Sequence, residues 1–435
     1  MHKVLIVSAN PFSKSSNNGK TLESLFANFP KENLSQLFFT YSKNLDFDYC
    51  DNYFYLPDSI ILHNLLSLKK QYGYVIGRKS INKKPVNNSF VSFFRRYFNS
   101  NNGFLNSNFL RDILWKFNDI SKNRKLKEWI RLQSPDIIFF HAGGARFSYD
   151  IVGYISDVFE IPIFVYYTDD YILNPEYRSI LQKLQHKRMY KFYPAMVERA
   201  KGCFAIGEMM ATEYSKFFKK NFFPIMNQAD FDKDGEINQD RNSSKEIISI
   251  NYFGGLHLQR WKSIVRLGVI INKIALCNNL NIVVNIYTAT HCTKDMFEQF
   301  ERSKVNYRGI LRGKELRDAQ LNSDILLHVE SDDVYYRSLT KLSVSTKLPE
   351  YLSTRNCILG FGPPEVASMR LLVDNNIGYY VNSGEDDIEV MNKLELLLAD
   401  IELRKNIADR GYKYVCENLN PNIIRKQFEE QLNRL

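Results

Sequence analysis

The sequence predicts an α/β fold made of two doubly wound units, each with a parallel sheet covered by helices on both faces. Short apolar runs bounded by turn residues alternate with helical stretches along the chain. A polar segment interrupts this alternation once, and the alternation then starts again. The chain has 435 residues, 44% of them hydrophobic and 14% aromatic, so each half can bury a core of its own.

The first unit is expected to span residues 1–227. Its expected strands are apolar runs that suit burial on both faces, KVLIVSA (3–9), SPDIIFFH (134–141) and IPIFVYYTDD (161–170). The stretch AKGCFAIGEMMATEYSKFF (200–218) predicts a strand, a turn at Gly207 and a helix. Residues 228–246 are rich in Asp, Asn and Ser, which is typical of a linker.

The second unit is expected to span residues 247–411, and a helix at about 412–435 is expected to pack back on the first unit. Strands and helices alternate again in this unit, in the order IISINYF, QRWKSIVRLGVIINKIAL, NIVVNIYT, KDMFEQFER, VNYRGIL, GKELRDAQLN, DILLHVE, the stretch 344–365, IGYYVN and DDIEVMNKLELLLAD. Two such units are expected to face each other across a cleft, with the ligand bound at the carboxyl ends of the strands.

Composition excludes several classes of protein. No apolar run approaches the ~18 to 20 residues of a membrane-spanning helix. The start, MHKVLIVSANPF, lacks a small-residue cleavage pattern and predicts a first strand rather than a signal peptide, so a cytoplasmic location is expected. The six cysteines form no CxxC pair, which argues against a disulfide framework or a zinc site.

The net charge of +10 is concentrated in one segment. Residues 62–131 contain 15 Lys and Arg but only 3 Asp and Glu, and aromatic residues are interspersed among them. Such a segment suits the anionic inner face of a cell membrane, where the protein is expected to bind peripherally. Helices with a solvated charged face, or a nucleic-acid surface, are the alternatives. The sequence contains no RNA- or DNA-binding motif, so no nucleic-acid partner is expected.

The stretch STKLPEYL places a lysine and a glutamate three residues apart. Ser345 or Thr346 can cap a helix there, with Pro349 in its first turn. The free N–H groups of a helix start and the Lys347 ammonium would together suit a phosphate. Glu350, about one turn further, can accept hydrogen bonds from a ribose diol. The alternative is a surface ion pair that contributes ~0.2 to 0.5 kcal/mol.

Two further loops suit a nucleotide. NYFGGLHLQRW (251–261) ends a strand with Gly254 and Gly255, which let a ligand approach the backbone. Arg260 and Lys262 follow and can bind a pyrophosphate. In VNYRGILRGKEL the main chain of Gly309 and Ile310 can meet a flat base. Each loop, taken alone, can equally be an ordinary turn.

The second half resembles the donor domain of GT-B glycosyltransferases, especially retaining glycosyltransferase family 4, in the stretches YFGGLHLQRWKSI, YRGILRGKELRDAQLNSDILLHV and STKLPEYLSTRNCILGF. In the first half, NNGKTLESLFANF resembles the acceptor-side glycine loop of that family, and SPDIIFFHAGG resembles the strand that delivers a histidine to the cleft. The resemblance implies a GT-B fold and a hexosyltransferase. The enzyme would move a sugar from a nucleotide-diphosphate sugar to a saccharide or lipid-linked acceptor, in bacterial surface-polysaccharide synthesis, without a metal or other cofactor.

The family's site roles transfer to matching positions. The implied donor-binding residues are Gly254, Gly255, Arg260, Lys262, Gly309, Ile310, Ser345, Thr346, Lys347 and Glu350. The implied acceptor-side loop residues are Asn18, Gly19 and Lys20.

The chain departs from the family pattern at one place. The family often has two glutamates separated by seven residues, but the position eight before Glu350 is Leu342. This departure leaves open the donor-sugar contact and the choice between retention and inversion. Glu330, Arg337 or Lys341 can take the place of the absent glutamate.

Three residues are the candidates for chemistry at the sugar or the acceptor hydroxyl. His141 follows an apolar strand and is expected near its carboxyl end. Asp169 and Asp170 end another strand on the same side, and either can act as a base or orient the acceptor. A core histidine and a pair of helix-capping aspartates are the structural alternatives.

Other readings carry less support. A GT-B-fold nucleotide-sugar epimerase and a basic, non-catalytic binding protein are the main alternatives. SKSSNNGKT resembles a phosphate-binding P-loop, but Lys14 occupies its first glycine position. DFDKDGEINQD resembles a calcium loop, but Arg241 stands at its twelfth position, where a carboxylate is needed. DFD at residues 46–48 lies in a loop-like stretch, and we do not interpret it as a metal motif.

Overall fold

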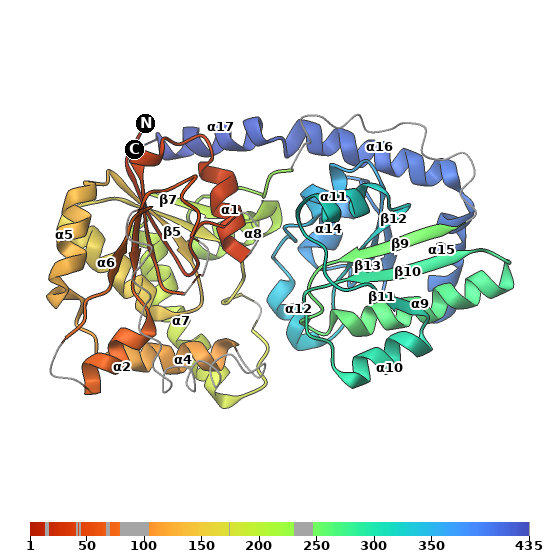
Figure 1. Ribbon diagram of the computed structural model, residues 1–435, viewed down its shortest axis with the longest axis horizontal. Helices are drawn as coiled ribbons and strands as arrows, with labels where there is room; N and C mark the ends of the chain where they lie inside the picture. Colours follow the sequence, from red (N-terminus) through yellow and green to blue (C-terminus); the bar gives the residue numbers. More distant parts are fainter. Residues whose placement is uncertain are drawn as a thin grey trace. The chain divides into compact units, whose positions relative to one another are not determined.

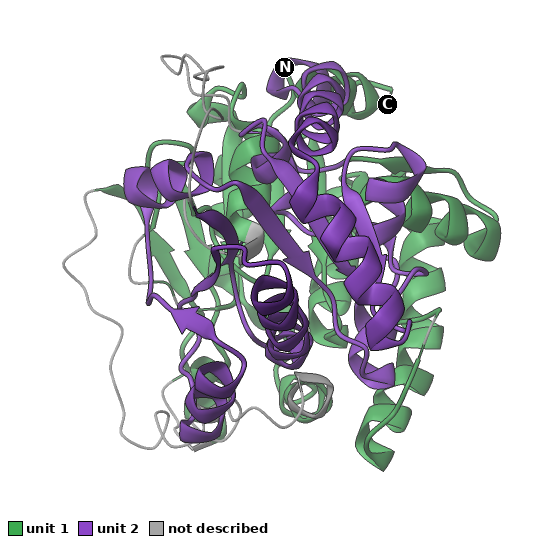
Figure 2. Cartoon of the chain, turned by 90° about the vertical axis from the view of Figure 1, so that its right-hand side faces the viewer, with its two compact units in different colours: residues 1–225, 425–435 green, residues 226–424 purple. Residues whose placement is uncertain are grey.

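The structure is a computed structural model. It describes residues 1–13, 17–40, 42, 45–66, 70–78, 104–173, 175–229 and 247–434. The chain divides into two compact units (Figure 2): the first contains Met1–Ile225 together with Arg425–Leu435, and the second contains Met226–Ile424. Of the linker expected at 228–246, residues 230–246 lie outside the described residues.

The first unit is built on an eight-stranded sheet with the order β4-β3-β2-β1-β5-β6-β7-β8 in the described part of the chain. All neighbouring strands are parallel except β4, which is antiparallel to β3. The strands are β1 (Val4–Ser8), β2 (Leu34–Phe38), β3 (Asn52–Tyr55), β4 (Tyr74–Ile76), β5 (Ile137–Ala142), β6 (Ile163–Tyr167), β7 (Gly202–Ala205) and β8 (Phe222–Pro224).

Helices cover both faces of this sheet (Figure 1). The described helical elements are α1 (Asn17–Phe26), η1 (Lys31–Asn33), α2 (Asp58–Leu66), α4 (Phe104–Trp115), η3 (Ile120–Lys122), α5 (Arg124–Gln133), α6 (Arg146–Phe159), α7 (Ile180–Arg199), α8 (Gly207–Phe218) and α17 (Pro421–Leu432). The runs expected to form strands at 3–9, 134–141 and 161–170 contain β1, β5 and β6, and 200–218 contains β7 and α8.

The C-terminal helix α17 completes the core of the first unit. The ring of Phe428 lies 5.1 Å from that of Phe26, 5.4 Å from Phe139 and 5.6 Å from Phe204, measured between centroids. Arg425 Nε donates a hydrogen bond to the Ser24 carbonyl at 3.0 Å. The last helix of the chain therefore packs on α1, β5 and β7 of the first unit.

The second unit is built on a six-stranded parallel sheet with the order β11-β10-β9-β12-β13-β14 in the described residues. Its strands are β9 (Ile248–Phe253), β10 (Ile282–Tyr287), β11 (Val305–Tyr307), β12 (Ile325–Val329), β13 (Cys357–Gly362) and β14 (Tyr379–Asn382). Its helices are α9 (Arg260–Cys277), α10 (Lys294–Arg302), α11 (Gly313–Leu321), α12 (Val334–Thr340), α13 (Leu348–Leu352), α14 (Ala367–Asp374), α15 (Asp387–Ala399) and α16 (Ile401–Asn418). The predicted α/β fold is confirmed, with two sheets that are parallel apart from β4.

A row of asparagines sets the register of three strands in this sheet. Asn285 on β10 pairs with Asn251 on β9 and with Asn306 on β11. The Asn285 amide donates to the Asn251 side chain at 2.8 Å, and Asn251 donates to Ser323 Oγ at 2.8 Å. A slip of one residue would turn these amides toward the apolar core, so the row helps to fix the register.

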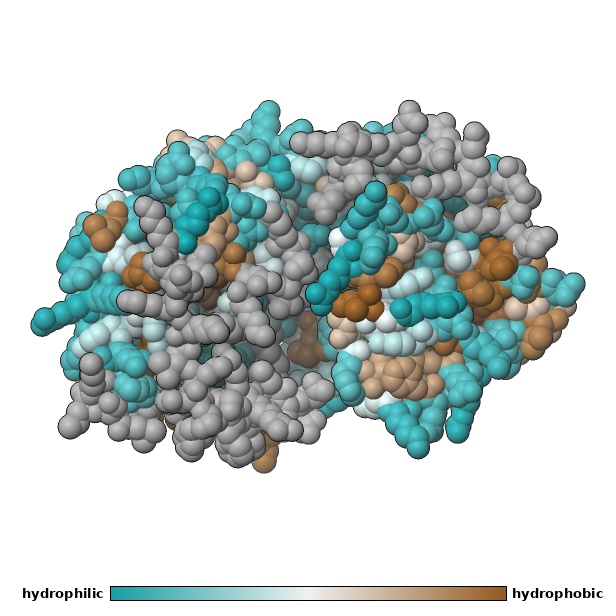
Figure 3. All heavy atoms as spheres, viewed as in Figure 1, coloured by the Kyte–Doolittle hydropathy of each residue, from teal (hydrophilic) through white to brown (hydrophobic). Residues whose placement is uncertain are grey.

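None of the helices in the described residues combines the length and the apolar character that crossing a bilayer requires. On the face shown in Figure 3, hydrophobic side chains occur in several separate groups among hydrophilic ones.

Candidate functional site

The loop between β9 and α9 has an unusual backbone. Gly254 has φ +152°, and a Cβ at this position would lie 1.7 Å from Lys347 Nζ. Leu258 and Gln259 both adopt the left-handed conformation, with φ of 61° and 59°. Non-glycine residues rarely adopt it, and such strain is concentrated at functional sites. The loop thus leaves space for the Lys347 side chain directly at the carboxyl end of the sheet.

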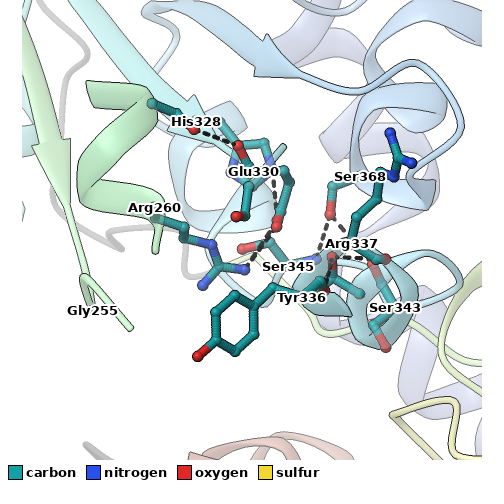
Figure 4. A network of polar contacts seen from close by, with 12 residues as sticks. Gly255, Arg260, His328, Glu330, Tyr336, Arg337, Ser343, Ser345 and Ser368 are labelled. Atoms are coloured by element: carbon teal, nitrogen blue, oxygen red, sulfur yellow. Dashed lines mark hydrogen bonds and ion pairs between the residues drawn. The ribbon is translucent and has the colours of Figure 1, made fainter. Parts of the chain in front are cut away.

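A buried ion pair joins the start of α9 to the end of β12. Arg260 Nη2 donates to both carboxylate oxygens of Glu330, at 3.1 and 2.9 Å. The two side chains are 13% and 2% exposed. Burial opposes the charge of Arg260, but the adjacent Glu330 carboxylate outweighs this and raises the pKa of the guanidinium. Figure 4 shows Arg260 between the Gly255 loop and Glu330.

Lys347 places a second cation in the same region. Its Nζ lies 5.1 Å from the centre of the Tyr252 ring and forms no ion pair with the described residues. Burial lowers the pKa of Lys347 to about 7, and the Arg260 charge adds to this effect, while Glu330 and Glu350 oppose it. An anion bound here would supply the counter-charge that the ammonium lacks. Arg260, Lys347 and the Gly254–Gly255 loop are called the cationic socket below.

The helix after Lys347 begins one or two residues later than the sequence suggests. Helix α13 has five residues, and Lys347 rather than Ser345 or Thr346 occupies its N-cap position. The Lys347 N–H donates to Ser345 Oγ at 3.4 Å, and the Leu348 N–H donates to the Ser345 carbonyl at 3.2 Å. Ser345 therefore already accepts from two of the N–H groups that were expected to be free for a phosphate. Pro349 lies in the first turn, as expected.

Ser345 and Glu350 lie on either side of Lys347 in sequence. The Ser345 N–H donates to Ser368 Oγ at 2.9 Å, which fixes the approach to α13 (Figure 4). Glu350 is partly exposed on α13, and its carbonyl accepts from Arg317 and from Ser353 Oγ. Glu350 is close enough to Lys347 for its charge to act on the ammonium. Thr346 is exposed.

The remaining donor-side candidates divide into two groups. Gly309 and Ile310 follow β11 at the same carboxyl edge, where the Gly309 carbonyl accepts from the Thr288 N–H at 2.7 Å. Gly309 has φ +79°, and Ile310 is 47% exposed. Lys262, in contrast, is exposed, and its ammonium lies 5.8 Å from the centre of the Trp261 ring. The structure thus places Lys262 outside the contacts of the socket.

Three residues around the socket were missed from the sequence. Tyr252 supports the loop by donating its hydroxyl to the Gly255 carbonyl at 2.7 Å. His328 is buried, with Nε2 at 3.6 Å from Glu330 Oε1. Burial lowers the pKa of both His328 and His257, and the charges of Arg260 and Lys347 lower it further. His257 nevertheless remains partly exposed. Because both imidazoles are neutral, Arg260 and Lys347 carry the positive charge of this region.

The position of the absent family glutamate holds a residue that cannot replace it chemically. Leu342, eight residues before Glu350, is 1% exposed and belongs to the core. Of the three candidate substitutes, Glu330 is the one that contacts the socket, through Arg260. Arg337 pairs with Glu365 at 3.2 Å, and the Lys341 carbonyl accepts from the Ala367 N–H.

The first unit brings His141 and Asp169 together through one threonine. His141 Nε2 lies 3.5 Å from Thr168 Oγ1, which donates to Asp169 Oδ2 at 3.2 Å. His141 is 3% exposed, and burial lowers its pKa to about 4, so the ring is neutral at physiological pH. Burial also raises the pKa of Asp169, against hydrogen bonds from Thr168 and Tyr171.

Asp170 has a different environment from Asp169. Its Oδ1 accepts from the N–H groups of Ile172 and Leu173 and from the Tyr214 hydroxyl, each at 3.0 Å. These bonds hold the bend after β6 and do not cap a helix, since the next described helix, α7, begins at Ile180.

The predicted acceptor-side loop forms the start of α1. A Cβ at Gly19 would lie 2.3 Å from the Pro11 carbonyl, so this helix packs closely on the preceding loop. Lys20 lies in the same helix, while the side chain of Asn18 lies outside the described residues.

Several other sequence patterns fall on residues that the structure leaves out. They are Lys14 of the P-loop-like stretch, the calcium-like loop at 230–241, and residues 67–69 and 79–103 of the basic segment. Within the described ranges, His, Cys, Asp and Glu side chains form no group of three that could hold a metal ion.

No protein-family model matches the sequence, and no curated protein matches it. Solved structures do match the fold over nearly the whole chain. The sucrose-phosphate synthase of Thermosynechococcus elongatus aligns with a TM-score of 0.62 at 11% identity, covering 100% of this chain and 99% of that one. Alr3699/HepE from Anabaena, solved in complex with UDP-glucose, aligns with a TM-score of 0.60 at 12% identity, covering 100% of both chains.

A third similar structure is WaaG, a glycosyltransferase involved in lipopolysaccharide biosynthesis. It aligns with a TM-score of 0.58 at 11% identity and covers 98% of this chain and 99% of its own. The fold expected from the resemblance is confirmed: this chain has the GT-B fold of glycosyltransferases.

Proposed function

We propose that the protein is a glycosyltransferase that moves a hexose from a nucleotide-diphosphate sugar to a saccharide or lipid-linked saccharide acceptor. The cationic socket is the observation that carries the proposal. In such a reaction the leaving group is a nucleoside diphosphate, on which negative charge grows as the glycosidic bond breaks. Fixed cations in a poorly hydrated site stabilise that charge. Arg260 and Lys347 supply them at the carboxyl edge of the second sheet.

The rest of the donor is recognised by residues on the same edge. Glu350 accepts hydrogen bonds from the ribose diol, and the main chain of Gly309 and Ile310 meets the base. Gly254 carries no side chain, so the Lys347 ammonium can lie against the loop that the phosphates approach. The positions of Gly254 and Gly309 at the ends of β9 and β11 support these roles. Bacterial surface-polysaccharide synthesis is the proposed setting, and WaaG, with a similar fold, acts in lipopolysaccharide synthesis.

The first unit supplies the acceptor-side chemistry in this proposal. A neutral His141 can donate or accept a hydrogen bond with a sugar hydroxyl. Asp169 acts as the base or orients the acceptor hydroxyl, and its raised pKa favours proton uptake. Asp170 is left out of this role, because its oxygen already accepts three hydrogen bonds.

The proposed acceptor-bearing partner is the anionic face of a membrane. In the described part of the basic segment, Phe117 is 67% exposed and Ile113 is 37% exposed. Helix α7 packs on α4, where Arg188 lies 4.7 Å from the centre of the Phe109 ring. It adds an Ile180 side chain that is 78% exposed. Exposed lysines follow along α7, and exposed apolar groups flanked by lysines suit a lipid interface.

A thermal-shift panel tests the donor proposal directly. UDP, ADP, GDP, CDP and dTDP, each alone and as a sugar conjugate, are added to the full-length protein. A ligand at 100 times its Kd stabilises the folded state by ~2.7 kcal/mol, which gives a clear shift. One nucleotide should shift the unfolding temperature more than the others. No shift with any of them would contradict the proposal.

Product analysis separates the transferase from the epimerase alternative. The nucleotide sugar selected by the panel is incubated with the protein, with and without oligosaccharide acceptors. A transferase releases the nucleoside diphosphate and extends the acceptor only when an acceptor is present. An altered sugar formed from the donor alone would favour the epimerase.

A further inference from the structure

We propose that Glu330 is a positioning residue: it holds Arg260 so that the guanidinium presents its unbound edge to the loop of Gly254 and Gly255. The inference rests on the proposed function, since it concerns how the donor diphosphate is held. In this view Glu330 does not touch the ligand and acts only through Arg260.

The geometry of the pair leaves part of the guanidinium available. Both oxygens of Glu330 accept from the same nitrogen, Nη2, at 3.1 and 2.9 Å. Arg260 Nε is buried without a hydrogen-bond partner, and Nη1 forms no hydrogen bond to the described residues. A carboxylate that binds arginine side-on would engage two nitrogens. Because the Glu330 carboxylate binds only Nη2, Nη1 remains available to another anion.

Glu330 is itself held rigidly. Its N–H donates to the Phe361 carbonyl at 3.1 Å, and its carbonyl accepts from Ser263 Oγ at 3.1 Å. Ser263 lies in the first turn of α9, close to Arg260. The end of β12 and the start of α9 are therefore tied together by side chain and main chain. A guanidinium fixed in this way loses less conformational freedom when a phosphate binds.

The position of Glu330 allows it to support Arg260 without competing with a bound diphosphate. Its side chain is 2% exposed, whereas Arg260 retains 13% exposure. In Figure 4 the guanidinium lies between Gly255 and Glu330, so the carboxylate is on the side away from the loop. A diphosphate can thus reach Arg260 from the loop side without displacing Glu330.

A double-mutant cycle on diphosphate binding tests the inference. Affinity for UDP, ADP, GDP, CDP and dTDP is measured by calorimetry for the unmodified protein, Glu330→Ala, Arg260→Ala and the double variant. Glu330→Ala should weaken the preferred diphosphate roughly tenfold, as expected when a charged hydrogen-bond arrangement is lost. In the Arg260→Ala background the same change should have no effect or improve binding, because it then removes an unpaired carboxylate from an anion site.

Two further variants keep the result interpretable. Glu330→Gln retains one acceptor for Arg260 and should lie between the unmodified protein and Glu330→Ala; it also replaces Glu330→Ala in the cycle if that variant unfolds. Asp409→Ala removes the partner of Arg355 in an exposed pair of the same unit and should leave affinity unchanged.

The outcomes separate this inference from the proposed function. Equal losses from Glu330→Ala in both backgrounds would show a general structural role and overturn the inference alone. Tighter binding by Glu330→Ala in the presence of Arg260 would also overturn it, since the carboxylate would then compete with the ligand. If the unmodified protein binds no diphosphate, the proposed function fails and the inference fails with it.

Discussion

The carboxyl edges of the two sheets share an architecture but differ in chemistry. In the second unit, Arg260 pairs with Glu330, and Lys347 lies against the glycine loop with no ion pair among the described residues. In the first unit, His141, Thr168 and Asp169 form a chain of hydrogen-bonding groups in which no described lysine or arginine takes part. In the proposed function, the same fold element therefore serves as an anion site in one unit and as a site for neutral hydroxyl groups in the other. The fold provides the edge, and the residues at the strand ends decide the ligand.

The largest effect is expected from Lys347→Ala. Loss of an ammonium that contacts a diphosphate should weaken nucleotide binding about 100-fold, since hydrogen bonds to charged groups contribute ~1.5 to 3 kcal/mol. Calorimetric titration measures this loss. Lys273→Ala, an exposed lysine of α9, is the matched control and should change affinity little. Unchanged affinity in Lys347→Ala would contradict the proposal that the second unit, unlike the first, binds its ligand through positive charge.

The next effect concerns the stability of the first unit. Because burial lowers the pKa of His141 to about 4, the folded protein binds fewer protons than the unfolded chain between pH 4 and 6.5. Stability should therefore fall as the pH decreases through this window, by ~2 kcal/mol from pH 7 to pH 5 for this group. Urea unfolding of the unmodified protein and of His141→Gln at both pH values measures the difference. Identical pH dependence in the two proteins would contradict a neutral buried imidazole.

Binding to the socket should depend on pH in the opposite direction. The Lys347 pKa is lowered to about 7 in the free protein, and a bound diphosphate favours the charged form. The groups that act on this ammonium are Arg260, Glu330 and Glu350. Affinity should fall by up to about tenfold per pH unit above pH 7, with proton uptake on binding. Calorimetry at pH 7 and 8.5 in two buffers measures both, and Lys347→Arg should lose the dependence. An affinity that does not change with pH would mean that Lys347 stays charged.

The smallest effect is expected at the proposed membrane surface. Each lysine near an anionic bilayer contributes ~1 kcal/mol, so Lys187→Ala on α7 should weaken vesicle binding about fivefold. Co-sedimentation with vesicles containing phosphatidylserine measures this, and phosphatidylcholine vesicles provide the control. Equal binding to both vesicle types would argue against charge recognition by the first unit.

Local sequence pattern was sufficient for the apolar strands and for much of the socket. β1, β5 and β6 were predictable because a strand buried on both faces needs a continuous apolar run. Strands β2 (LSQLF) and β3 (NYFY) were missed, because they mix polar and apolar residues over a few positions. Helix α7 continues through Pro194, where a sequence rule would end it.

The site shows the same division between local and long-range information. Arg260 and Lys347 were identified from the glycine loop and from the lysine–glutamate spacing. Lys262 was included with them, but two residues along a helix rotate a side chain by ~200°, so it faces away from Arg260's contacts. The role of Glu330 as the partner of Arg260 was not predictable, because 70 positions separate them and only adjacent β9 and β12 bring them together.

The sequence by itself determined that this chain forms two parallel α/β sheets and that cations and glycines lie at the strand ends of the second. These features follow from side-chain hydrophobicity and backbone conformation, which act over a few residues. The tertiary structure alone decided that Lys347 lies against Gly254, that Glu330 holds Arg260, and that α17 closes the core of the first unit. Such contacts depend on which strands become neighbours, and strand order is set by the packing of the whole unit rather than by any local stretch.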